Sequence, residues 1–539
     1  MKRVILILSL LIMLSACVQD FEETEPYNGF SIPGELPDIG EFSGKKQRDR
    51  FYDEYTPDFI PSKEYGKIIP YIGGYKEYTN NDESWKVTSS FPSYGFCTPD
   101  GKIVMDASSK TANIYYRETY DGFGYYTVYL NMKQRKDAPD EFYAEEQLII
   151  PESGEWCLKL DKNEWGSQAG GGIIVICGYI NGDYQNAICK LYDYNGNKIN
   201  EFTGYDSFGT YAHGLMTASK WDDKEGYSAA FLNLDGEVVL GPYASVSNFQ
   251  QSGTACVTDF AGNSYLIDTA GNRVTKKSYS QIYLETPFGE ERIIYTARCN
   301  DGGTDILDGF GNILGHLDTD KYVSICLPEN GEIICYYNNY NGNNYTDEYI
   351  WKRLSDGSDF VSREFNVSPN QYYYDNDMYV HKADDGRAIV FDGDGETVAI
   401  LDNWESISQL SPNGRYLVYT SGKYDYSSQV PEEIEQGKIH IYDTYEKTDT
   451  FVADGSGYVS FVGEDGRYAI VCATEEFTIF GGYSNYYLFD TKTNTKLFDN
   501  CQYVESQTVG GETYYSVCTD NSNTLYDEDM NVILRLYNE

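Results

Sequence analysis

Phe231-Leu232-Asn233-Leu234-Asp235-Gly236 is the phrase that decides the fold of this 539-residue chain. Two apolar residues are followed by Asn or Asp, two further residues and Gly, and the phrase returns at residues 191–196, 266–271, 306–311 and 390–395. An apolar pair is typical of the end of a buried strand, Asn or Asp caps a turn, and Gly adopts the positive φ that such a turn needs. Each copy therefore predicts a β-hairpin.

The copies recur at a regular spacing. Looser copies centre on Leu354, Asp443, Asp490 and Asp527, and from Asp193 to Asp527 the intervals average about 42 residues. Propeller blades repeat every 40–45 residues or so, whereas the sequence shows almost no helical periodicity. The repeat therefore favours a β-propeller over the other all-β architectures.

A second hairpin signal precedes several copies, at residues 98–102, 411–415 and 463–467. Two hairpins per unit give four strands, which is one blade. We therefore predict an all-β propeller of four-stranded blades over residues 63–539. About ten or eleven units fit this length, although ordinary propellers close with roughly four to eight. We favour seven or eight blades with an elaborated N-terminal part, and keep a larger ring or two propellers as alternatives.

These units resemble the repeats of two protein families. Residues 94–104 and 243–249 are similar to WG-type repeats, although they lack the Trp-Gly pair, and residues 411–417 with 441–443 resemble WD40-like or TolB-like blades. The resemblance implies a propeller and carries no activity with it. A TolB-like blade adds one alternative role, that of a scaffold in envelope assembly.

The charge of the chain excludes several functions. Lys and Arg number 41 and Asp and Glu number 84, so the formal net charge is −43. Such a chain repels phosphate backbones and has no basic face for an anionic membrane, so we expect no nucleic-acid partner. The 53 Tyr and 25 Phe argue for a folded body in spite of the charge.

The N-terminus has the pattern of a lipoprotein signal. Lys2 and Arg3 precede an apolar run that ends near Met13, which is shorter than the ~20 residues of a membrane-spanning helix. Leu14-Ser15-Ala16-Cys17 then resembles the bacterial lipobox, which implies a signal peptide over residues 1–16 and lipidation of Cys17. We expect the membrane to be reached through this lipid anchor alone.

Residues 17–62 are acidic and rich in Pro and Gly, which is typical of a tether. Acidic residues directly after the lipid-bearing Cys also resemble the surface-export signal of Bacteroidota lipoproteins. The predicted location is the bacterial cell envelope, outside the cytoplasm, either on the outer-membrane surface or on the outer face of the plasma membrane.

The 12 Cys residues lie mostly in apolar strand-like runs, so we interpret them as buried thiols. One pair is different, because Asn330-Gly331 is a strong two-residue hairpin signal. If these two residues form the turn, Cys326 lies opposite Cys335, and a cross-strand disulfide between them is an alternative to two thiols.

Long insertions mark the candidate binding face. Residues 338–345, 421–437 and 474–486 all fall between the second and third strands of a unit, and such connections emerge on one face of a propeller. Tyr340, Tyr345 and Tyr483 suit stacking on sugar rings or gripping a peptide. The expected partner is a glycan or a protein at the cell surface, while solvated decoration is the alternative interpretation.

No catalytic motif is visible. The sequence has no G-x-S-x-G elbow, no P-loop and no Cys/His cluster at zinc spacing, so we assign no catalytic residue, no metal and no cofactor. The four His residues are scattered at His213, His316, His381 and His440. We therefore expect a non-catalytic binding or scaffold protein. A propeller-fold enzyme acting on extracellular polysaccharide is the alternative, because acidic pairs are abundant.

Overall fold

The computed structural model describes residues 56–79, 88–108, 110–134, 142–180, 187–222, 226–286, 292–328, 330–338, 349–373, 378–383, 385–402, 404–411, 413–425, 432–462, 466–476, 483–519 and 521–537. Every regular element in these ranges is a β-strand, and no α-helix occurs among them. In the same ranges no helix is long and apolar enough to cross a membrane. The all-β prediction is confirmed.

The strands pair antiparallel with their neighbours in the chain. The first three sheets contain β1 (Ile69–Thr79), β2 (Thr88–Cys97), β3 (Ile103–Met105), β4 (Thr111–Glu118), β5 (Gly124–Gln134), β6 (Phe142–Pro151), β7 (Leu158–Leu160), β8 (Glu164–Gly170), β9 (Ile173–Tyr179), β10 (Ala187–Asp193) and β11 (Lys198–Thr203). The next sheets contain β12 (Ser207–Ala212), β13 (Leu215–Asp222), β14 (Gly226–Leu232), β15 (Val238–Tyr243), β16 (Ser245–Val246), β17 (Thr254–Thr258), β18 (Ser264–Asp268), β19 (Tyr279–Leu284), β20 (Ile294–Cys299), β21 (Thr304–Asp308) and β22 (Ile313–Leu317).

The second half of the chain continues in the same way. Its strands are β23 (Ser324–Cys326), β24 (Ile334–Asn338), β25 (Tyr349–Arg353), β26 (Gln371–Tyr373), β27 (Met378–Lys382), β28 (Ala388–Phe391), β29 (Thr397–Leu401), β30 (Trp404–Leu410), β31 (Tyr416–Asp425), β32 (Glu432–Asp443), β33 (Thr448–Asp454), β34 (Ser456–Val462), β35 (Tyr468–Glu476), β36 (Tyr483–Asp490), β37 (Thr495–Cys501), β38 (Tyr503–Val509), β39 (Glu512–Cys518), β40 (Ser522–Tyr526) and β41 (Val532–Tyr537).

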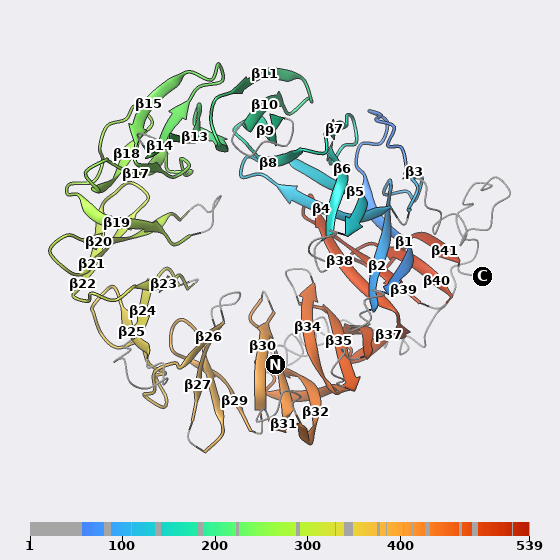
Figure 1. Ribbon diagram of the computed structural model, residues 1–539. Helices are drawn as coiled ribbons and strands as arrows, with labels where there is room; N and C mark the ends of the chain where they lie inside the picture. The colour runs from blue at the N-terminus through green and yellow to red at the C-terminus, as the bar shows by residue number, and fades with distance from the viewer. Residues whose placement is uncertain are drawn as a thin grey trace, which may run out of the picture.

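These strands form the blades of one large propeller. Figure 1 shows the sheets following one another in chain order around a ring, with β23, β26 and β30 as the strands of their blades that lie nearest the centre of the ring. The described strands make ten sheets, of which one has seven strands, from β16 to β22. Because β18 and β19 share the single registered pair Ser264↔Tyr279, this sheet is two blades joined at one point. The described strands therefore form eleven units.

The favoured count of seven or eight blades was too low, and the larger ring kept as an alternative is correct. Some units have three strands instead of four, which explains why the hairpin signals are not all present in every repeat. In the units β16–β18 and β23–β25 the fourth strand is reduced to one isolated bridge, Ile267↔Arg273 in the first and Lys352↔Asp359 in the second. The repeat length is preserved although the strand is not.

The three-stranded sheet β1–β3 closes the ring. Strand β38 of the last blade contacts β4, while β1 packs against β39 and β40. One hydrophobic cluster accordingly joins β1–β3 to the sheets on both sides, from Ile68 through Tyr126 to Leu536. The buried Asn523 side chain also donates a hydrogen bond to the Gly73 carbonyl at 3.1 Å. The first and last parts of the chain are thus held by both apolar and polar contacts.

The recurring phrase forms the turn that its residues predicted. At Asp308, Oδ1 accepts hydrogen bonds from the backbone N–H of Phe310 at 2.9 Å and of Asn312 at 2.8 Å, and Gly311 has a φ of 80°. The same pair of hydrogen bonds to the side chain occurs at Asp193, Asn233, Asp259, Asp268, Asp392 and Asp527. The acidic and amide side chains at these turns are therefore structural.

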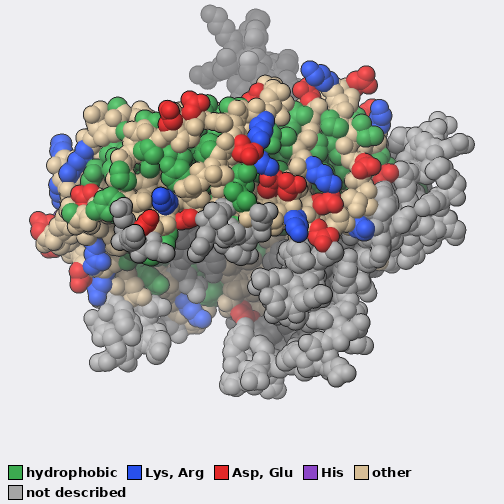
Figure 2. Space-filling view, turned by 45° about the horizontal axis from the view of Figure 1, so that its top comes forward, with side chains coloured by type: hydrophobic (Ala, Val, Ile, Leu, Met, Phe, Trp, Pro, Cys, Tyr) green, Lys and Arg blue, Asp and Glu red, His purple; other side chains and the backbone are tan. Residues whose placement is uncertain are grey.

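The core lies between neighbouring blades rather than at one central point. Val175 of β9 packs in the cluster shared with the following blade, and Ile176, the next residue, packs in the cluster shared with the preceding blade. Successive side chains of a strand point to opposite faces, so a strand covered on both faces is apolar throughout. On the face shown in Figure 2, acidic and basic side chains are interspersed rather than gathered in one patch.

Candidate functional site

The side chains of the residues predicted to bind a lipid or a ligand are not among those that the structure describes. Cys17, Tyr340 and Tyr345 lie outside the described residues, and Tyr483 is the first residue of β36, with its side chain outside the description. Much of the insertion at 421–437 is strand rather than loop, because β31 extends to Asp425 and β32 begins at Glu432. The proposed ligand-binding role of these tyrosines stays a prediction.

The disulfide between Cys326 and Cys335, which the sequence left open as an alternative to two thiols, is not formed. Cys326 lies opposite Ile334, and Cys335 lies opposite Ile325, because the hairpin contains one more residue than a two-residue turn requires. Gly331 has a φ of 81° and its N–H donates to the Pro328 carbonyl at 3.0 Å. A shift of one residue turns every side chain to the other face of the sheet.

The two sulfur atoms consequently face different blades. Cys326 packs in a cluster with Tyr379 of the following blade, and Cys335 packs in a cluster with Ile294 of the preceding blade. Among the described residues no disulfide is formed. Burial raises the pKa of the Cys335 thiol to about 12, with smaller contributions from Glu285 and Glu332. This thiol is a packing group rather than a reactive one.

A group of aromatic residues, here called the tyrosine patch, lies between the blade β19–β22 and the blade β23–β25, with two exposed rings and the half-buried ring of Tyr336. It consists of Tyr283, Tyr322 and Tyr336. The rings of Tyr283 and Tyr322 meet edge to face at 5.5 Å, and their residues are 38% and 60% exposed. Burial raises the pKa of Tyr322, and the nearby Glu285, Tyr283 and Tyr336 raise it further.

The patch adjoins the hairpin that carries two of the predicted tyrosines. Tyr336 of β24 contacts Tyr349 of β25 edge to face at 6.0 Å, and Tyr340 and Tyr345 lie between these two strands in the sequence. Glu285, beside the patch, accepts a hydrogen bond from Thr296 Oγ1 at 2.5 Å. Burial raises the pKa of the Glu285 carboxyl group. Exposed aromatic rings next to a carboxyl group are a combination that can bind an uncharged polar ligand.

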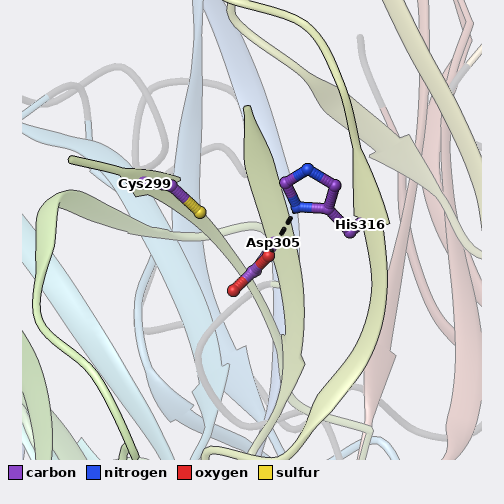
Figure 3. A group of neighbouring side chains, drawn as sticks. All are labelled: Cys299, Asp305 and His316. Carbon is purple, nitrogen blue, oxygen red and sulfur yellow. Dashed lines mark hydrogen bonds and ion pairs between the residues drawn. The ribbon is translucent and has the colours of Figure 1, made fainter. Parts of the chain in front are cut away.

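A second polar group, the Asp305 cluster, lies inside the blade β19–β22. It consists of Lys277, Tyr279, Cys299, Asp305 and His316. The Asp305 carboxylate, which is 3% exposed, accepts from Lys277 Nζ at 2.9 Å, from His316 Nδ1 at 2.7 Å and from the Tyr279 hydroxyl at 3.0 Å. Figure 3 shows the Asp305 and His316 side chains pointing toward each other, with the Cys299 sulfur nearby.

Electrostatics explain why this buried carboxylate is tolerated. Burial raises the pKa of Asp305, but the hydrogen bonds from Lys277, His316 and Tyr279 together outweigh it, so the pKa is lowered. The hydrogen bond to Asp305 likewise raises the pKa of Lys277. A buried charge that is paired and fully hydrogen-bonded is stable in this environment.

Three members of the cluster are also possible metal ligands. The ligand atoms of Cys299, Asp305 and His316 all lie within 4.8 Å of one another, and sulfur, imidazole and carboxylate together suit zinc. However, Lys277 Nζ lies 3.2 Å from Cys299 Sγ as well as 2.9 Å from Asp305 Oδ2. The lysine ammonium therefore already supplies the cation that these groups need. Sequence spacing could not reveal the cluster, because strand pairing assembles it.

Comparisons with known proteins give no family. No protein-family model matches the chain, and no curated protein matches it. Among solved structures, a eukaryotic initiation factor is similar with 12% identity and a TM-score of 0.34, over 68% of this chain and 94% of that one. BamB from Moraxella catarrhalis is similar with 12% identity and a TM-score of 0.24, over 55% of this chain and 91% of that one. A Dos1 propeller is similar with 10% identity and a TM-score of 0.22, over 60% and 80% of the two chains. At these scores they assign no function.

Proposed function

We propose that this β-propeller is a lipid-anchored protein of the bacterial envelope, located outside the cytoplasm, that binds a glycan through the tyrosine patch. The observation that carries the proposal is the exposed contact between Tyr283 and Tyr322, 5.5 Å apart, at the base of an insertion rich in Tyr and Asn. A protein ligand is the other class that such a surface can accept, and the experiment below separates the two.

The chemistry of the patch favours a glycan. An aromatic face offers apolar area with little entropy to lose, and the C–H face of a sugar ring can stack on it. The carboxyl group of Glu285 beside the patch has oxygen atoms that can accept hydrogen bonds from sugar hydroxyl groups. The net charge of −43 disfavours an anionic ligand, so an uncharged polysaccharide is the expected class.

The proposed location rests on the first residues of the sequence. A short basic start, an apolar run of less than spanning length and Cys17 in a lipobox-like context support a lipid anchor. An acidic stretch rich in Pro and Gly follows, and it would hold the propeller away from the bilayer.

The test is binding of the full-length chain, purified in detergent, to an array of immobilised neutral and acidic polysaccharides. We expect a neutral polysaccharide to be retained, and Tyr283→Ala and Tyr322→Ala each to weaken its binding by about tenfold, since one lost aromatic contact costs ~1.4 kcal/mol. Phe260→Ala is the matched control, because Phe260 is 62% exposed in a turn of another blade. Unchanged binding by both tyrosine variants would exclude the patch. If no polysaccharide binds, and a pull-down from solubilised membranes with the full-length chain retains an envelope protein, the scaffold role is supported instead.

A further inference from the structure

A hydrogen-bonded Ser–His–Asp arrangement lies on the blade β30–β33, which the blade β26–β29 separates from the tyrosine patch. Ser421 Oγ lies 3.0 Å from His440 Nε2, and His440 Nδ1 lies 3.1 Å from Asp449 Oδ2. A carboxylate can only accept a hydrogen bond, so the tautomer of His440 with its proton on Nδ1 satisfies the contact to Asp449 and leaves Nε2 to accept from the serine hydroxyl. This is the polarity in which a histidine acts as general base toward a serine.

Strand register brings the three side chains together. His440 of β32 lies opposite Tyr419 of β31, and Ser421 is two residues further along β31, on the same face. On the other side of His440, Asp449 of β33 lies opposite Tyr442, again two residues away and on the same face. The imidazole therefore spans the sheet diagonally from one strand to the next.

The imidazole is held in a fixed orientation. The Tyr419 ring stacks on it at 4.7 Å and 15°, and the Phe451 ring meets it edge-on at 6.3 Å. The His440 side chain is 14% exposed, whereas the Asp449 side chain is 43% exposed. Burial raises the pKa of the Tyr419 phenol, and Asp449 raises it further, which places this phenol beside the same carboxylate. Tyr419 and Asp449 thus position the ring.

The backbone at the serine is irregular in a way that suits a reactive side chain. The register of β31 against β32 shifts between Ser421 and Lys423, and Gly422 in this bulge has a φ of 128°, which side-chain-bearing residues rarely adopt. Bulges turn a side chain out of the regular pleat and are frequent next to active sites. Lys438, directly opposite Ser421 in the register and exposed, adds a cation on the same face.

We propose that Ser421 and His440 are catalytic residues of a carboxylic-ester hydrolase site, with Asp449 as the positioning residue. Ser421 Oγ attacks the acyl carbon while its proton moves to His440 Nε2. The tetrahedral intermediate then expels the alcohol, which takes that proton, and leaves an acyl ester on Ser421. A water molecule attacks this ester and gives one proton to His440, which returns it to Ser421 Oγ as the carboxylic acid departs. No co-reactant other than water is needed.

This activity goes beyond the proposed glycan binding, and the two do not depend on each other. The site is on β31–β33, and the tyrosine patch is formed by Tyr283 of β19, Tyr322 before β23 and Tyr336 of β24. An ester-bearing polysaccharide bound at the patch would be one source of substrate. The test of the hydrolase site uses no glycan, so a negative result there does not affect the proposal of glycan binding, and the reverse also holds.

The experiment is labelling of the full-length chain with a fluorophosphonate probe, which phosphonylates activated serines, followed by peptide mass spectrometry. We expect one labelled residue, Ser421. Ser421→Ala and His440→Gln should each lower the labelling rate at least about 100-fold, within the range that general base catalysis contributes. Asp449→Asn should slow it by a smaller factor, because Asp449 is partly solvated.

Ser406→Ala is the matched control, because the Ser406 hydroxyl lies on the neighbouring strand β30, 2.7 Å from the Thr420 hydroxyl. It should label like the unmodified chain. Thermal unfolding of each variant shows whether the fold is kept, and hydrolysis of p-nitrophenyl acetate gives a second readout. Absence of label on Ser421 in the folded chain would overturn the proposal. If the unmodified protein is not labelled and all three triad variants unfold at lower temperatures, the hydrogen bonds have a structural role only, and the proposal is also overturned.

Discussion

Lys277 Nζ lies 2.9 Å from Asp305 Oδ2, and the two ends of this ion pair have very different environments. The Asp305 side chain is 3% exposed, whereas the Lys277 side chain is 44% exposed. The lysine therefore reaches from the surface to neutralise a carboxylate inside the blade. An apolar side chain of similar size can therefore occupy the place of Lys277, but it cannot neutralise the buried carboxylate.

Replacing Lys277 by Met should lower the free energy of unfolding by about 1–3 kcal/mol, because it leaves a buried carboxylate with neutral donors and His316 only. Lys276→Met, on the exposed neighbouring residue, is the control and should change stability little. Urea unfolding followed by tyrosine fluorescence measures both. Equal stability of the two variants would show that the ion pair contributes nothing.

The same carboxylate predicts a pH dependence. Since the pKa of Asp305 is lowered in the folded protein, its stabilisation is complete above the unfolded value of about 4 and disappears as the pH falls through the lower folded value. The stability difference between the unmodified chain and Asp305→Asn should therefore be constant from pH 7 to about pH 5 and shrink toward pH 2. Unfolding curves at several pH values measure it, and a difference that grows toward low pH would contradict the assigned direction.

The strand register predicts the redox behaviour of Cys326 and Cys335. Because they face different blades, intact mass under non-reducing conditions should equal the reduced mass, and both thiols should react with iodoacetamide only after unfolding. Mass spectrometry of native and denatured samples reads this directly. An intact mass lower by two hydrogen atoms in the native sample, but not in a Cys335→Ala variant, would show that the disulfide forms.

The hairpin turns predict a conformational cost at one glycine. Gly262 has a φ of 82°, and a Cβ atom added there would meet no other atom within 4 Å. Gly262→Ala should therefore cost about 1 kcal/mol through backbone strain alone, and Gly262→Asn less, because Asn tolerates the left-handed region better. Chemical denaturation compares the two. A larger cost for Asn than for Ala would point to a contact instead.

The lipid anchor predicts a chemical modification. Cells fed an alkyne-tagged fatty acid should label the chain through Cys17, and Cys17→Ser should remove the label and release the protein from the membrane fraction. Cys157→Ser is the control, because Cys157 lies in the propeller and should not affect labelling. Labelling that persists in Cys17→Ser would place the lipid elsewhere or refute the anchor.

Local interactions explain which parts of the fold were predictable. The turn at Asp308 is made by hydrogen bonds between residues two and four apart, so the short motif is enough to predict it. The looser copies at Asp443 and Asp490 instead bond to residues two and three apart. The hairpin predicted at Asn330-Gly331 is present, but its predicted register was wrong, since the same two residues can form turns of different loop length. Loop length sets the register, and the register decided that Cys326 and Cys335 lie on opposite faces.

The candidate sites were predictable to a much smaller extent. The interpretation of His316 and His440 as scattered residues was natural, because their polar partners are up to 19 residues away in the sequence and on other strands. The same holds for Tyr283 and Tyr322, which are 39 positions apart and belong to different blades. No motif spacing exists for side chains that meet through strand pairing.

The sequence by itself determined the repeating unit, because a hairpin turn with Asp or Asn and a positive-φ Gly is specified within six residues. Only the tertiary structure decided how many units close the ring and which polar side chains meet. Ring closure depends on the packing of β1 against the last blade, and the Ser421–His440–Asp449 arrangement depends on the register of three strands. Both are non-local, and a shift of one residue in the register of β31 or β33 against β32 would separate the three side chains.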